Sequence, residues 1–109
     1  MHDHAKFVDV VIALGSNIDR RSNIPEAVRL IRRHQGIDVE AVSCVFESDA
    51  VGGPADNPPF YNAAMLACTD LSPERLRDEL RDIERVLGRV RTDDKNAART
   101  IDIDLVYYG

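Results

Sequence analysis

The sequence has few of the features that mark secreted, membrane or nucleic-acid-binding proteins. It contains no tryptophan and two cysteines, which is too few for a disulfide framework. No apolar run approaches the roughly 18 residues of a membrane span, and the first residues lack the cationic and apolar regions of a signal peptide. Lys and Arg number 14 against 19 Asp and Glu, a net charge of -5 that argues against nucleic acid or an acidic membrane surface as the main partner. We therefore expect a cytoplasmic protein.

The rest of the composition is ordinary for a globular protein. The chain has 109 residues, of which 44% are hydrophobic and 30% charged, so residues 1–109 are expected to form a single domain. Cys44 and Cys68 lie inside apolar runs, which favours small core residues over metal ligands.

Hydrophobic periodicity predicts six elements. Alternating or continuous apolar residues predict strands over 8–14, 39–46, 60–69 and 100–108. The apolar phase slips near Ala41, which indicates a β-bulge in the second strand. Helical spacing predicts a first helix that begins at Asn23 and ends at Gly36. A second helix is predicted between Ser72, as its N-cap, and Gly88.

The order of these elements predicts an α+β fold of the ferredoxin-like type, βαββαβ, with an antiparallel sheet. Right-handed crossovers place both helices on one face of that sheet, so the opposite face is left open for loops or a ligand. Residues 52–59 are rich in glycine and proline and lie between two strands. A loop of this length in a compact domain favours a binding loop over a passive connector.

Two aspartates stand out in the last predicted strand. Asp102 and Asp104 are two residues apart, so they project from one face, opposite the apolar Ile101 and Ile103. Paired carboxylates are suited to holding Mg²⁺. The alternative is that the two aspartates only face solvent on the exposed side of an edge strand.

Basic residues precede this strand in a chain that is acidic overall. Four cations lie upstream at positions Arg89, Arg91, Lys95 and Arg99. Guanidinium groups bind phosphate oxygens bidentately, so a cationic loop that leads into an acidic strand favours a site for magnesium and a nucleotide. The alternative is that the cations neutralise Asp93 and Asp94. There is no glycine-rich phosphate loop of the Walker type.

Residues 95–106 contain a cation, a small pair, Arg, two residues, then Asp-x-Asp and aliphatics. This segment resembles the signature of one family, the 6-hydroxymethyl-7,8-dihydropterin pyrophosphokinases of folate synthesis. Residues 13–17, 60–64 and 88–91 resemble the family's N-terminal motif, third-strand motif and post-helix motif. The resemblance implies a ferredoxin-like fold and an enzyme that transfers pyrophosphate from ATP to 6-hydroxymethyl-7,8-dihydropterin and releases AMP.

The resemblance also implies roles for individual residues in ATP binding. Asp102 and Asp104 are expected to bind two Mg²⁺ ions, and Glu84, near the end of the second helix, is expected to contact the nucleotide. The residues expected to engage the phosphates and order the catalytic loop are Arg89, Arg91, Lys95 and Arg99.

A second group of residues is expected to bind the pterin. Asn62 matches the residue that hydrogen-bonds the ring, and Phe60 matches the aromatic that stacks on it. Ser48 and Val51 are expected to line the pocket. The alternatives are that Asn62 is a polar residue satisfied by a neighbouring strand and that Phe60 only packs in the core.

The sequence departs from the family pattern in a few places. Asn96 stands where tryptophan is common, Phe60 where tyrosine is common, and Asp49 with Ala50 where a proline pair is common. Family members continue beyond the aspartate strand, whereas this chain ends at Gly109. We therefore expect a domain without the family's C-terminal segment, and an impaired or noncatalytic pterin- or nucleotide-binding paralogue is the alternative to the enzyme. An interaction domain without a small ligand is a third, weaker alternative, and the sequence does not indicate an oligomeric state.

Overall fold

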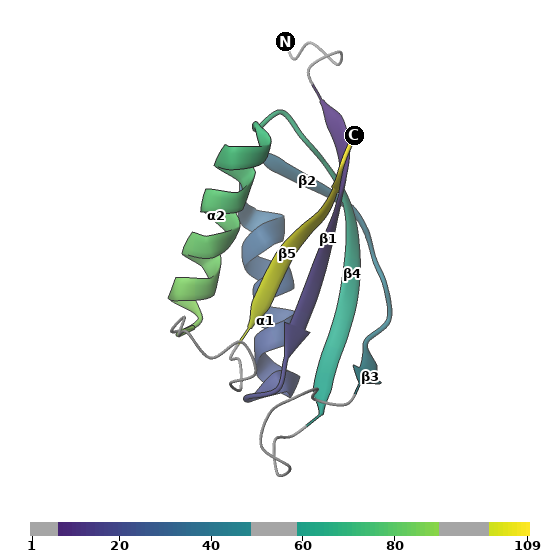
Figure 1. Cartoon of the computed structure of the whole chain (residues 1–109), viewed down its shortest axis with the longest axis vertical. Coiled ribbons are helices and arrows are strands. Elements are labelled where there is room, and N and C mark those ends of the chain that lie inside the picture. The colour runs from purple at the N-terminus through teal and green to yellow at the C-terminus, as the bar shows by residue number, and fades with distance from the viewer. Residues whose placement is uncertain (1–6, 49–58, 90–100) are drawn as a thin grey trace.

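The computed structural model describes residues 7–48, 59–89 and 101–109 and shows one antiparallel sheet with two helices (Figure 1). The elements are β1 (Val8–Ser16), α1 (Arg20–Arg33), β2 (Ile37–Val42), β3 (Phe46–Ser48), β4 (Phe60–Thr69), α2 (Pro73–Val86) and β5 (Asp102–Tyr108). This is the predicted α+β order, with the short β3 as an addition.

The strands pair in the order that a ferredoxin-like fold requires. The sheet runs β2-β4-β1-β5, with β3 also paired to β4, and all of these pairs are antiparallel. Both helices lie against the same face of the sheet (Figure 1). No helix among the described residues covers the other face, so the predicted open face is confirmed.

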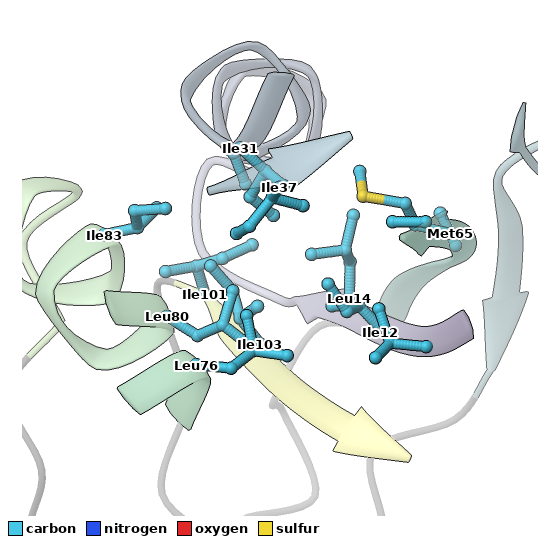
Figure 2. Packing of buried hydrophobic residues seen from close by; sticks show 14 of the residues in the cluster. Ile12, Leu14, Ile31, Ile37, Met65, Leu76, Leu80, Ile83, Ile101 and Ile103 are labelled. Carbon is cyan, nitrogen blue, oxygen red and sulfur yellow. The ribbon is translucent and has the colours of Figure 1, made fainter. Parts of the chain in front are cut away.

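The core lies between the helices and the covered face of the sheet. Figure 2 shows Ile12 and Leu14 of β1 and Met65 of β4 close to the side chains that the helices contribute. In α2, Leu76, Leu80 and Ile83 form a buried stripe. Removal of these apolar side chains from water is the main force that holds the helices on the sheet.

The predicted second strand is divided in two. Residues 43–45 interrupt it, so β2 ends at Val42 and β3 begins at Phe46. The register of β2 against β4 shifts between Val39 and Ala41, which confirms the predicted irregularity near Ala41. The interruption lies after this bulge, where the pairing of β2 with β4 has already shifted by one residue.

The first helix begins earlier than predicted. Asp19 adopts a left-handed conformation with a φ of 45°, and its carbonyl accepts hydrogen bonds from the N–H groups of Ser22 and Asn23. The prediction of Asn23 as the N-cap is therefore wrong. Asn23 lies within the helix, and its side-chain amide donates to the carbonyl of Ile18 at 2.7 Å.

The second helix begins as predicted. The Ser72 hydroxyl accepts a hydrogen bond from the N–H of Arg75 at 3.2 Å, and Pro73 occupies the first helical position. Gly88 follows the helix with a φ of 90°, a conformation that favours glycine. Neither α1 nor α2 is long and apolar enough to span a membrane.

The two cysteines do not lie in the core, so that prediction is wrong. Cys44 is exposed in the segment between β2 and β3, and Cys68 is half-buried in β4. The apolar run around Cys68 alternates between faces, and Cys68 has the parity of the open face rather than that of buried Ala67 and Thr69.

Candidate active site

Asp102 and Asp104 lie on the open face of the edge strand β5, as the alternation of the sequence predicts. Ile103 between them is 4% exposed and belongs to the core beneath the helices. Asp102 pairs with Gly15 of β1, and Asp104 pairs with Ala13. Residues paired across antiparallel strands share a face, so both carboxylates lie beside small residues of β1.

The Asp102 carboxylate and burial both act on the pKa of Asp104. Loss of surrounding water raises the pKa of Asp104, and the charge and hydrogen bond of Asp102 and the charge of Glu84 raise it further. Arg89 acts in the opposite direction. Two converging carboxylates with mutual repulsion are the donor set that a hard divalent cation stabilises, so Asp102 and Asp104 fit Mg²⁺.

Arg89 connects the end of α2 to the start of β5. Its Nη1 donates to Asp102 Oδ1 at 2.8 Å, to the carbonyl of Ile101 at 3.1 Å and to Glu84 Oε2 at 3.2 Å. The side chain is 11% exposed. These contacts hold the guanidinium beside the aspartate pair, where a phosphate bound there would meet it.

Glu84 is buried in the last turn of α2. The residue is 1% exposed, and its Oε2 accepts a hydrogen bond from the N–H of Ile103 at 2.8 Å in addition to that from Arg89. Its predicted contact with ATP stays a prediction, because the structure shows this carboxylate bonded inside the protein.

Further cations lie along α2 near the aspartate pair. A hollow of about 160 Å³ is lined by Arg81, Glu84, Arg85 and Arg89. A smaller hollow of about 90 Å³ lies where Arg77 and Arg81 approach Asp104. This side of the aspartate pair therefore offers positive charge to an anion.

Three of the predicted pterin residues lie together where β3 pairs with β4. Ser48 pairs with Phe60, and Phe46 pairs with Asn62. The Asn62 amide donates to the Ser48 hydroxyl at 2.8 Å and is half-buried. The alternative that a neighbouring strand satisfies Asn62 thus describes this structure, and its contact with a pterin stays a prediction.

The two groups of residues meet in one row across the sheet. Asn62 of β4 pairs with Gly15 of β1, and Gly15 pairs with Asp102 of β5. Two strand spacings separate Asn62 from Asp102, or about 10 Å between their Cα atoms. A Cβ added at Gly15 would lie 3.5 Å from Asn62 Oδ1 and 3.7 Å from the Phe60 ring. Gly15 therefore keeps the space between the two groups free of a side chain.

Sequence reasoning did not assign a role to Gly15 or to Arg20. Gly15 was part of a matching motif, but only its register with two strands shows what its lack of a side chain does. Arg20 donates to the carbonyl of Pro59 at 2.6 Å and lies 4.0 Å from the centre of the Tyr61 ring. It thus ties the start of α1 to the start of β4, next to Phe60.

Several predicted site residues lie outside the described part of the chain. They are Val51, Arg91, Lys95 and Arg99. Their assignments to pterin, phosphates and the catalytic loop stay predictions, as does the binding loop predicted over 52–59.

Comparison with known proteins identifies the family. The family model described as 7,8-dihydro-6-hydroxymethylpterin-pyrophosphokinase matches residues 11–109. The chain belongs to this family. Every described element apart from the first strand's opening residues lies within the match, so the predicted resemblance is confirmed.

Relatives of the pyrophosphokinase family from bacteria and plants resemble the chain to a similar degree. A 2-amino-4-hydroxy-6-hydroxymethyldihydropteridine pyrophosphokinase of Pseudomonas aeruginosa is 40% identical over 92% of this chain, and one of Bacillus subtilis is 39% identical over 89%. A folate synthesis bifunctional protein of Arabidopsis thaliana is 40% identical over 94%. The chain spans 61%, 58% and 21% of the lengths of these three proteins, respectively.

Proposed function

We propose that this protein transfers a pyrophosphoryl group from ATP to 6-hydroxymethyl-7,8-dihydropterin, with Mg²⁺ as cofactor and AMP as product, in folate biosynthesis. The observation that carries the proposal is the row Asn62, Gly15 and Asp102 across the open face. It brings the residue expected to bind the acceptor within about 10 Å of the residue expected to hold the metal. Names of the bacterial relatives support the same reaction.

The chemistry needs positioning and charge neutralisation more than a reactive side chain. The hydroxymethyl oxygen of the pterin bonds to the β-phosphorus of ATP. The bond from that phosphorus to the α,β-bridging oxygen breaks, AMP leaves, and the hydroxyl proton is released. Bound Mg²⁺ would neutralise phosphate charge and lower the pKa of the attacking hydroxyl.

Each part of the site then has a defined task. Asp102 and Asp104 hold Mg²⁺, and Arg89 donates to phosphate oxygens from its position 2.8 Å from Asp102 Oδ1. Asn62 and Phe60 orient the pterin at the other end of the row. The absence of a side chain at Gly15 leaves the path between acceptor and donor open.

The proposal is tested by assaying AMP release from ATP and hydroxymethyldihydropterin in the presence of Mg²⁺. We expect AMP only when both substrates are present. Calorimetry should show that Asp102→Asn abolishes Mg-dependent ATP binding, and that Asn62→Ala weakens pterin binding by roughly 1–3 kcal/mol with little effect on ATP.

The matched control is Asp78→Asn, which removes an exposed carboxylate from α2 and should change neither affinity. Binding of both ligands without AMP release would contradict the catalytic proposal and favour the noncatalytic paralogue. Equal losses of affinity for ATP and for pterin in the Asn62 variant would mean that Asn62 stabilises the sheet instead of hydrogen-bonding the pterin ring.

A further inference from the structure

Glu84 is the one buried acid among the described residues, and its place in the fold is unfavourable without compensation. It lies in the last turn of α2, where the helix dipole opposes a negative charge. Burial of a carboxylate is unfavourable unless hydrogen bonds and an opposite charge compensate it. The contacts that compensate Glu84 therefore show what the residue does.

The first of these contacts is with the backbone between the two aspartates. Glu84 Oε2 accepts from the N–H of Ile103 at 2.8 Å. Among the described strands β5 is at the edge of the sheet, paired only with β1. The carboxylate thus accepts the hydrogen bond from the Ile103 N–H that the carbonyl of a further strand would otherwise accept. This bond fixes the peptide plane that joins Asp102 to Ile103.

The second contact is with the cation beside the same pair. Glu84 Oε2 also accepts from Arg89 Nη1 at 3.2 Å, and that nitrogen lies 2.8 Å from Asp102 Oδ1. One carboxylate oxygen of α2 thereby holds both the backbone of the aspartate strand and the guanidinium that faces it. Loss of either contact would let the pleat of β5 and the spacing of the two carboxylates vary.

We propose that Glu84 is a positioning residue for the metal site: through its bond to the Ile103 amide it fixes the geometry in which Asp102 and Asp104 bind a divalent cation. The inference rests on the proposed function, in which those two aspartates hold Mg²⁺. It assigns to Glu84 a role in site geometry that needs no contact with ATP.

Two conservative variants separate the effect of side-chain length at position 84 from the effect of its charge. Glu84→Gln keeps an oxygen at the same distance from the Ile103 amide but removes the charge, whereas Glu84→Asp keeps the charge and is one methylene too short. The probe is Mn²⁺ alone, with free ion measured by electron paramagnetic resonance. We expect Glu84→Asp to bind Mn²⁺ at least tenfold more weakly than the parent and Glu84→Gln to stay within about threefold, because partners that orient metal ligands are typically worth 10–100-fold in affinity.

A second readout follows the backbone without metal. In ¹H–¹⁵N spectra the Ile103 amide should stay protected from hydrogen exchange in Glu84→Gln and lose protection in Glu84→Asp. Glu79→Gln and Glu79→Asp are the matched controls, because Glu79 lies on the same helix and bonds His34 at 3.1 Å, on the side of α1. These variants should leave Mn²⁺ affinity and the Ile103 amide unchanged.

The other outcomes decide against the inference in distinguishable ways. A greater loss of Mn²⁺ affinity in Glu84→Gln than in Glu84→Asp would show that Glu84 acts through its charge. Equal Mn²⁺ affinities in both variants and the parent would show that Glu84 has no role in the site. If the parent itself binds no Mn²⁺, or if Asp102→Asn leaves Mn²⁺ binding intact, the metal assignment of the proposed function fails, and the inference fails with it.

Discussion

The thiol of Cys68 lies among carboxylates from two other strands on the open face. Its Sγ donates to Glu40 Oε1 at 2.5 Å and lies 3.5 Å from Asp9 Oδ1. The hydrogen bond to Glu40, followed by burial and the Asp9 carboxylate, raises the pKa of the Cys68 thiol to about 12. Because the thiolate is the reactive form, Cys68 should be a poor nucleophile at neutral pH.

Replacement of Glu40 should make the Cys68 thiol more reactive. In Glu40→Gln the negative charge beside the thiol is lost, so the pKa of Cys68 should fall, and each unit of that fall gives tenfold more thiolate. We expect iodoacetamide to modify Cys68 at least tenfold faster at pH 8, with the rate at exposed Cys44 unchanged. Peptide mass spectrometry measures both rates in one sample, and Glu47→Gln, at an exposed position on β3, is the control. An unchanged rate at Cys68 would mean that Glu40 does not set its reactivity.

At the scale of elements, β1 separates the two halves of the site. It pairs with β4, which carries Asn62, and with β5, which carries the aspartates. Gly15 is the position of β1 that faces both. A methyl group there would make contacts of ordinary van der Waals length, so the strand itself tolerates alanine.

We expect Gly15→Ala to fold with little loss of stability but to bind hydroxymethyldihydropterin at least tenfold more weakly, about 1.4 kcal/mol, because the added methyl stands in the path between Asn62 and Asp102. Thermal melts and calorimetry measure the two effects separately. Gly36→Ala is the opposite control: its Cβ would lie 3.0–3.2 Å from the Leu71 side chain, so stability should fall while affinity is kept. Unchanged pterin affinity in Gly15→Ala would show that the ligand does not cross this row.

At the scale of the whole molecule, the charge of Asp104 opposes folding when no metal is bound. Desolvation and the charges of Asp102 and Glu84 raise the pKa of Asp104 above its usual value of 3.8. The folded chain therefore binds the Asp104 proton more tightly than the unfolded chain does. Between the usual and the raised pKa the folded state holds more protons, so its stability falls as pH rises through that window.

Asp104→Asn should remove this penalty. We expect the variant, without metal, to melt above the parent at pH 7 and to lose less stability as the pH rises from 4 to 7. Mg²⁺ should raise the melting temperature of the parent and leave the variant unchanged, because only the folded parent offers the site. Asp82→Asn, on the exposed side of α2, is the control. A variant that melts below the parent at pH 7 would show that the Asp104 charge stabilises the fold.

The sequence by itself determined the features that depend on neighbouring residues. Alternation in β5 placed Asp102 and Asp104 on one face, and Ser72 with Pro73 marked the start of α2, because strand parity and helix capping act over a few residues. The order of elements then limited the topology to one with both helices on the same face. The family motifs added the expectation that Asn62 binds the pterin and that the two aspartates hold Mg²⁺.

Only the tertiary structure decided which distant residues meet. Asn62, Gly15 and Asp102 share a row because of strand register, and a shift of one residue would reverse the face of every side chain. Local periodicity also missed the true start of α1, since Asp19 takes a left-handed conformation that sequence spacing does not encode. The bond between the Glu84 carboxylate and the Ile103 amide, 19 residues along the chain, forms only because α2 packs on the edge strand. Such contacts depend on the summed burial of the whole core, and that is why no local pattern in the sequence reveals them.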